Sequence, residues 1–181
     1  MAGAHDPESV SNGWNLDRRE FLEDRLGADP KRATAVFEAD LTWLGGPGVE
    51  ARTEGAGIAF DLPPWAGGAG RGVQPVEALL AALAAEVVAG FTLAAARAGM
   101  TLSAVSAHVE GGVDLARSVG TVDQRPIVDL VQLELVCATA GDPTLAEGWL
   151  HQAVARSAIA GLFAAAGDPV QARLTAPYGR A

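Results

Sequence analysis

The sequence predicts an α+β fold in which two long, apolar helices pack on an antiparallel sheet. Between residues 37 and 62, apolar and polar residues alternate with the period of two that is typical of strands. The run from Leu79 to Ala96 has the length of a helix and contains one ionisable residue, Glu86. A second helix is expected at about residues 145–166, and its second half is almost wholly apolar. Two such helices carry more apolar surface than one sheet covers, so an intertwined homodimer is expected, with the helices between two sheets.

Composition limits the classes of function. The chain has 181 residues, of which 49% are hydrophobic and 19% charged, which excludes wholesale disorder. Its 13 basic and 22 acidic residues give a net charge of −9, which argues against nucleic acid or an anionic membrane as a partner. One cysteine, Cys137, excludes an internal disulfide. The first 13 residues lack the pattern of a signal peptide, so we expect a cytoplasmic protein.

The elements are expected in the order arm, three strands, helix, two strands, helix, strand. Residues 1–14 are polar and are expected to be poorly ordered, and residues 15–27 predict a short helix. The chain is therefore divided into a flexible terminus with a helical arm, residues 1–32, and a domain over residues 33–181. Strands are expected over residues 37–43, 49–54, 58–62, 105–110, 127–140 and 170–176.

The apolar run from Leu79 to Ala96 is just long enough to span a bilayer. Much of this run is alanine and glycine, however, and the ionisable Glu86 lies at its midpoint. Predicted strands also flank the run on both sides. We therefore expect a buried helix and no membrane association.

Several motifs resemble the OsmC/Ohr superfamily of cysteine-dependent hydroperoxide reductases. The resemblance depends on residues 61–64 (DLPP), Gly67-Gly68, Gly72, residues 75–85 (PVEALLAALAA) and residues 110–115 (EGGVDL). It covers roughly residues 33–176 and implies an OsmC-like fold with a pocket at the dimer interface.

The resemblance also implies that the family's chemistry is absent. The family's peroxidatic cysteine would fall at Glu86, and its resolving cysteine at Ser157. Val76 replaces the glutamate of the Ohr branch, no arginine lies near Pro47 in the first hairpin, and Cys137 matches neither cysteine position. In this family a cysteine thiolate attacks the peroxide oxygen. Because neither cysteine position holds a cysteine here, we expect no family-type peroxidase activity.

Glu86 is the first candidate for new chemistry. A carboxyl group on an apolar helix is expected to be desolvated, which raises its pKa and suits it to act as a general acid or base. The alternative is that Glu86 pairs with an arginine or reaches solvent. Ser157 would face Glu86 if the family's two cysteine positions remain neighbours, and it would hydrogen-bond the acid or a ligand, or only fill a helix contact.

Three further residues are candidates for substrate binding. Arg71 could act as an anion or carbonyl clamp, with an ordinary exposed arginine as the alternative. Trp43 and Trp65 could form pocket walls, as could Trp149, with core or rim packing as the alternative. The histidines and the cysteine lack ligand spacing, so neither a metal nor a cofactor is expected.

Three functions remain open at this point. The first is an enzyme of the isomerase, cyclase or lyase type that uses Glu86 for proton transfer on a small, largely apolar molecule. The second is a non-catalytic ligand-binding or stress-associated protein. The third is residual reduction of organic hydroperoxides through Cys137.

Overall fold

The computed structural model describes residues 10–29, 33–124, 128–138 and 142–176. Its contacts divide the chain into two compact units, Met1–Ala28 with Ala82–Ala181, and Asp29–Ala81. The boundary predicted between residues 32 and 33 stays a prediction.

The amino-terminal arm begins with a hairpin of β1 (Val10–Ser11) and β2 (Trp14–Asn15). Its turn residues Asn12 and Gly13 both have positive φ, as a two-residue hairpin turn requires. We expected residues 1–14 to be poorly ordered. Residues 1–9 lie outside the described residues, and for residues 10–14 the expectation is wrong because they form this hairpin. The helix predicted at residues 15–27 is confirmed as α1 (Leu16–Ala28).

The larger unit contains a sheet of three strands, β6 (Ala104–Val113), β7 (Val128–Ala138) and β8 (Gln171–Thr175). The short helix α3 (Leu115–Ser118) follows β6. Strand β7 is antiparallel to β6 but parallel to β8. The prediction of an antiparallel sheet therefore holds for the pair β6–β7 and is wrong for the pair β7–β8.

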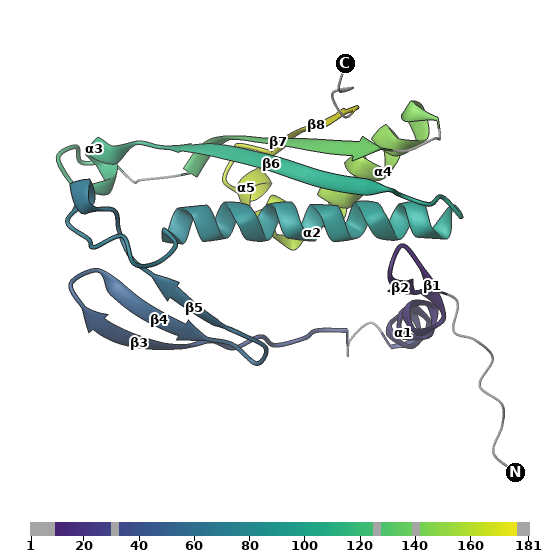
Figure 1. Cartoon of the computed structure of the whole chain (residues 1–181), viewed down its shortest axis with the longest axis horizontal. Helices are drawn as coiled ribbons and strands as arrows, with labels where there is room; N and C mark the ends of the chain where they lie inside the picture. The colour runs from purple at the N-terminus through teal and green to yellow at the C-terminus, as the bar shows by residue number, and fades with distance from the viewer. Residues whose placement is uncertain (1–9, 30–32, 125–127, 139–141, 177–181) are drawn as a thin grey trace, which may run out of the picture. The chain divides into compact units, whose positions relative to one another are not determined.

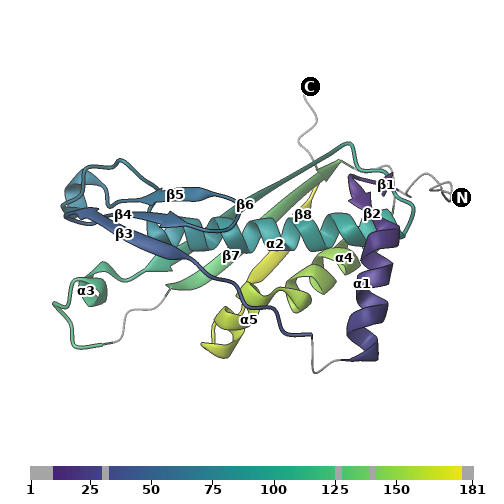
Figure 2. The ribbon, with the colours of Figure 1, turned by 90° about the horizontal axis from the view of Figure 1, so that it is seen from below.

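The helices of this unit lie on one side of the sheet (Figures 1 and 2). They are α2 (Pro75–Arg97), of which residues 82–97 belong to this unit, α4 (Pro143–Arg156) and α5 (Ala158–Ala165). The strand predicted at residues 127–140 is confirmed over β7, and its alternate apolar residues are buried. The central core residues are Leu83, Val87, Phe91, Val131, Leu133, Leu135 and Leu150.

The prediction of one uninterrupted helix at residues 145–166 is wrong, because two helices occupy this segment. The chain leaves the helical conformation at Ser157, where φ is −73° and ψ is 124°, and this residue separates α4 from α5. Helix α4 begins at Pro143, two residues before the predicted start, and is capped by Asp142, whose side chain accepts a hydrogen bond from the Thr144 N–H at 2.8 Å.

The smaller unit contains the predicted antiparallel meander, formed by β3 (Asp40–Gly45), β4 (Gly48–Arg52) and β5 (Gly57–Phe60). The following loop includes the 3-10 turn η2 (Pro64–Ala66). The buried carboxylate of Asp61 organises this loop by accepting hydrogen bonds from three backbone N–H groups, those of Leu62, Ala69 and Arg71, at 2.8, 3.1 and 3.0 Å. Gly68 is required here because a Cβ atom would lie 1.9 Å from the Leu62 carbonyl oxygen.

Helix α2 is the one helix among the described residues that is long and apolar enough to cross a membrane by length and composition. Core helices of soluble proteins pass the same test. Only 28% of its most apolar 18-residue window is buried within this chain.

Candidate functional site

The candidate site lies at Ser157, where the helical conformation is interrupted between α4 and α5. A new helix leaves the N–H groups of its first turn without intrahelical partners. At α5 these belong to Ala158, Ile159 and Ala160, because the first intrahelical bond runs from the Gly161 N–H to the Ser157 carbonyl oxygen, at 3.1 Å.

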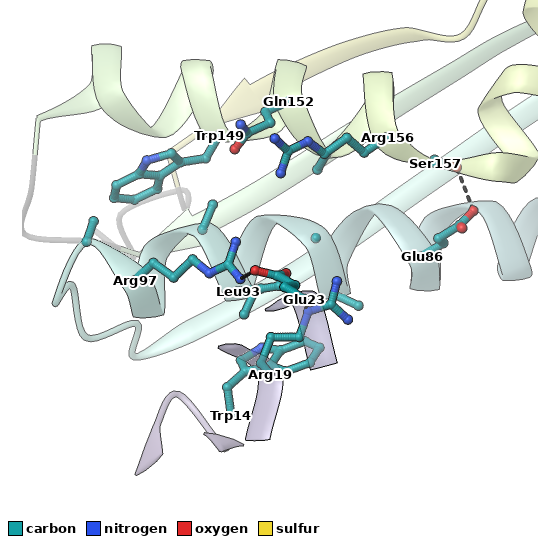
Figure 3. A pocket seen from close by; sticks show the side chains of 15 residues that line it. Trp14, Arg19, Glu23, Glu86, Leu93, Arg97, Trp149, Gln152, Arg156 and Ser157 are labelled. Atoms are coloured by element: carbon teal, nitrogen blue, oxygen red, sulfur yellow. Dashed lines mark hydrogen bonds and ion pairs between the residues drawn. The ribbon is translucent and has the colours of Figure 1, made fainter. Parts of the chain in front are cut away.

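Glu86 and Ser157 together satisfy all three of these donors. The Ile159 N–H donates to Oε2 of Glu86 and the Ala158 N–H to Oε1, each at 3.2 Å. The Ala160 N–H donates to Oγ of Ser157 at 3.0 Å, and the Ser157 hydroxyl in turn donates to Oε2 of Glu86 at 2.6 Å. The expectation that Ser157 faces Glu86 is therefore confirmed (Figure 3).

We call this arrangement of Glu86, Ser157 and the first turn of α5 the clasp. It joins α2 to the α4–α5 break across 71 residues of chain. Ser157 is buried at 5% exposure, and Glu86 is partly buried. Since Ser157 donates its proton to the carboxylate and accepts the Ala160 N–H, it is held as a helix cap.

The expectation of a raised pKa for Glu86 is wrong. Burial raises the pKa of this carboxyl group, but the hydrogen bonds from Ser157, Ile159 and Ala158 lower it by more, so its pKa lies below the ordinary value of 4.5. Glu86 is consequently a carboxylate at neutral pH. It can accept hydrogen bonds, but it holds no proton to donate as a general acid.

A hollow of about 610 Å³ opens beside the clasp, within the larger unit. Helix α2, helix α4 and the arm supply its walls (Figure 3). Its apolar side chains include Trp14, Leu93 and Trp149, and its polar side chains are Arg19, Glu23, Glu86, Arg97, Gln152, Arg156 and Ser157. This volume is in the range of sites for small organic ligands.

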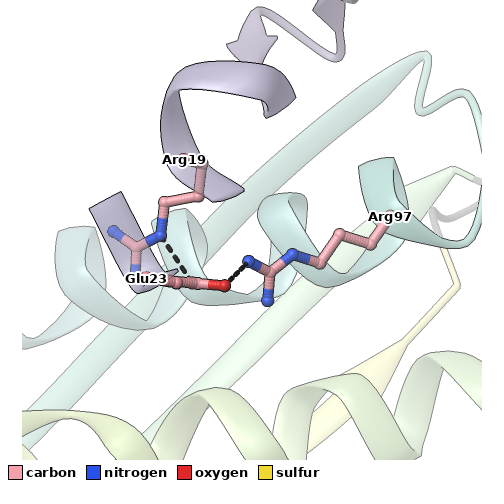
Figure 4. Close-up of polar contacts among 3 residues, drawn as sticks. All are labelled: Arg19, Glu23 and Arg97. Carbon is pink, nitrogen blue, oxygen red and sulfur yellow. Dashed lines mark hydrogen bonds and ion pairs between the residues drawn. The ribbon is translucent and has the colours of Figure 1, made fainter. Parts of the chain in front are cut away.

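The arm is held in place by specific polar contacts. Nε1 of Trp14 donates to the Thr92 hydroxyl at 3.1 Å. The Glu23 carboxylate bridges two arginines, accepting from Nε of Arg19 at 2.8 Å and from Nη2 of Arg97 at 2.5 Å (Figure 4). The hydrogen bonds from Arg97 and Arg19 hold the pKa of Glu23 below its usual value.

Most of these lining residues were missed by sequence reasoning. Trp149 was considered as a pocket wall, and the structure confirms that it lines the hollow. Trp14 lies in a segment that was expected to be poorly ordered. The spacing of Trp149, Gln152 and Arg156 along one helix face was the available signal for the α4 wall.

The predicted substrate-binding residues Trp43, Trp65 and Arg71 belong to the smaller unit. Trp43 is exposed and donates from Nε1 to the Gly46 carbonyl oxygen at 2.9 Å, and Trp65 is also exposed. Arg71 lines a separate hollow of about 370 Å³ within that unit. That these residues join Glu86 in one pocket stays a prediction.

Cys137 has none of the features of a reactive thiol. It is buried on β7, and burial raises the pKa of the thiol, which disfavours the thiolate. Among the residues that the structure describes, no group of three or more His, Cys, Asp or Glu side chains is placed to hold a metal ion.

Comparison with solved structures shows an OsmC-like fold. The OsmC-like protein of Mycoplasma pneumoniae is 17% identical, and the match covers 78% of this chain and 97% of that one with a TM-score of 0.67. An OsmC-like protein of unknown function from Vibrio cholerae is 17% identical, covering 78% and 100% of the two chains with a TM-score of 0.65. The organic hydroperoxide resistance protein OsmC of Legionella pneumophila is 18% identical, covering 80% and 98% with a TM-score of 0.61. The sequence matches no protein-family model and no curated protein.

The fold predicted from the motifs is thereby confirmed. At these identities the likeness concerns the fold alone, and the function has to be argued from the site.

Proposed function

We propose that this protein binds a small organic ligand in the hollow beside the clasp and has no thiol chemistry. The hollow carries this proposal, because it combines a suitable volume with two tryptophans and several polar side chains. The clasp supports it as well, since a carboxylate and a hydroxyl that cap a helix form a rigid edge for a binding site.

Binding is tested with two naphthalene compounds of the same shape, 1-naphthoate and 1-naphthamide, titrated against tryptophan fluorescence and by calorimetry. Ala89 lines the hollow and is exposed, so Ala89→Trp should fill it and abolish saturable binding. Ala155 on α4 is exposed but does not line the hollow, so Ala155→Trp is the matched control and should bind like the wild type. If neither compound binds, or if both variants bind equally well, the proposal is wrong.

A catalytic form of the same site would use Glu86 as a general base. Its atom Oε1 accepts one hydrogen bond, whereas Oε2 accepts two, so Oε1 retains room for a proton or a ligand donor. This form limits the predicted isomerase, cyclase or lyase chemistry to proton abstraction. Enhanced exchange of the α-protons of 2-tetralone in deuterated water would support it if Glu86→Gln abolished the enhancement. An exchange rate equal to that in buffer would leave binding alone.

We also propose that the protein is a cytoplasmic homodimer. Most residues in the apolar window of α2 keep some exposed surface within one chain, and a second copy that presents the same face would cover it. Native mass spectrometry tests the stoichiometry, and a monomer at micromolar concentration would contradict it. The same spectra would reveal a copurified ligand.

A further inference from the structure

The hollow beside the clasp concentrates positive charge on an acidic chain. Three arginines line it, Arg19, Arg97 and Arg156, against two glutamates, Glu23 and Glu86. One positive charge is therefore in excess at this place, although the chain as a whole carries −9. A local field of this sign attracts anions and disfavours cations.

The existing contacts show which of these charges is available to a ligand. Glu23 is shared between Arg19 and Arg97, and Glu86 is engaged in the clasp. Arg156, in the last turn of α4, makes no hydrogen bond or ion pair with any residue that the structure describes. Its guanidinium group keeps all its donors for a ligand, and a planar guanidinium matches a carboxylate with two parallel hydrogen bonds.

Gln152 adds a second polar group on the same face of α4. It lies four residues before Arg156, so the two side chains are neighbours on the helix surface. The Gln152 amide also makes no hydrogen bond within residues 10–29, 33–124, 128–138 and 142–176. The α4 wall therefore presents one charged and one neutral donor to the hollow.

The remaining wall is suited to a flat apolar body. Trp149 is positioned by an edge-to-face contact with Phe91, whose ring centroid is 6.1 Å away. Trp14 is positioned by its hydrogen bond to Thr92, and Leu93 lies on the α2 side of the hollow. Tryptophan rings that are already fixed provide contact area at a small cost in conformational entropy.

We propose that the hollow takes a small organic anion, a carboxylate on a flat apolar body, with Arg156 as its countercharge and Gln152 as an additional donor. This inference rests on the proposed function and names the class of ligand. It differs from the small, largely apolar molecule that the sequence suggests, because it requires a negative charge on the ligand.

Three probes with one ring system and different charges test this assignment: 1-naphthoate, 1-naphthamide and 1-naphthylmethylammonium. Calorimetry with the full chain should show naphthoate binding about tenfold more tightly than the amide, the effect of one charge-assisted hydrogen-bonding pair, and the ammonium more weakly than the amide. Arg156→Gln should remove the preference for naphthoate and leave the affinity for the amide within twofold. Arg156→Lys should retain part of the preference.

Arg173→Gln is the matched control, since it removes the same charge from an arginine outside the hollow that is paired with Glu134. It should leave the preference unchanged. Equal affinities for naphthoate and the amide, or a preference that survives Arg156→Gln, would overturn the anion assignment while the binding function stands. The absence of binding by all three probes would overturn both.

Discussion

The clasp makes the stability of the protein depend on Glu86, and Glu86→Gln is the most direct perturbation. The carboxylate accepts three hydrogen bonds, and hydrogen bonds to charged groups each contribute roughly 1.5–3 kcal/mol when well shielded. Glutamine keeps one carbonyl acceptor but places an amide donor against the donors of Ser157 and α5. After a discount for partial exposure, we expect the free energy of unfolding to fall by about 2 kcal/mol.

The assay is urea unfolding followed by tryptophan fluorescence at pH 7. With a typical dependence on urea, a loss of about 2 kcal/mol moves the midpoint down by roughly 1 M. Glu147→Gln is the matched control, because Glu147 is an exposed glutamate on α4 with no side-chain hydrogen bond to the described residues. It should move the midpoint very little.

A double-mutant cycle isolates the clasp from other effects of the substitution. Ser157→Ala removes both the cap on the Ala160 N–H and the donor to Glu86, so it should also cost about 2 kcal/mol. The double variant should be less destabilised than the two losses added together, by about 1 kcal/mol or more. Additive losses, or a Glu86→Gln variant as stable as the wild type, would refute the reasoning.

The pH dependence gives this prediction a sign. Because the pKa of Glu86 is lowered on folding, its carboxylate contributes stability that is fully present above the unfolded pKa and is lost as the pH falls through the folded pKa. The difference between wild type and Glu86→Gln should thus be constant above about pH 5 and shrink toward more acidic pH. A raised pKa would give the opposite trend, with a wild-type advantage that declines as the pH increases.

Three other predictions follow from single contacts. Glu23→Gln should loosen the arm and accelerate limited proteolysis of α1 by a few fold, because it breaks both exposed ion pairs, and equal cleavage rates would contradict the assigned arm contact. Gly90→Ala should lower the free energy of unfolding by about 1–3 kcal/mol, since the new Cβ would lie 3.0 Å from the Ala153 Cβ on α4. Gly148→Ala is the matched control and should not lower it, because its new Cβ has nothing within 4 Å. Thermal unfolding of both variants measures the difference. Cys137→Ser should leave peroxide consumption with a dithiol reductant unchanged, and faster consumption by the wild type would show that the buried thiol reacts.

Much of the fold follows from local pattern. The buried face of β7 follows from alternation, which records which side of a strand is covered. Alternation also predicts the strands of the meander β3 to β5, although every residue of β3 is exposed in this chain. The parallel pairing of β8 with β7 could not be predicted in this way, because a five-residue strand carries the same pattern in either direction. The arm helix was predictable, but the position of the arm as a wall of the hollow was not, because Trp14 and Glu23 bond to Thr92 and Arg97, which lie 78 and 74 residues away.

The site was predictable only in part, for a related reason. That Glu86 and Ser157 are neighbours was expected from the resemblance to the OsmC/Ohr superfamily, on the condition that the family's two cysteine positions remain close together. The break at Ser157 did not, because a serine within an alanine-rich run looks like any tolerated helix residue until a distant carboxylate takes up the freed N–H groups. The pKa shift of Glu86 was predicted with the wrong sign for the same reason. The apolar neighbours of Glu86 can be recognised in the sequence, whereas the N–H and O–H groups that donate to it cannot.

The clasp also explains why chemistry at these two positions would differ from that of a thiol pair. A nucleophile must leave a reactive atom uncommitted, whereas Oγ of Ser157 both donates to a carboxylate and caps a helix. Any ligand that engaged this oxygen covalently would have to break the hydrogen bond that keeps Glu86 and α5 together. The available polar groups therefore lie on the α4 wall of the hollow, at Gln152 and at Arg156, which directly precedes Ser157, and it is there that a ligand can bind without disrupting the fold.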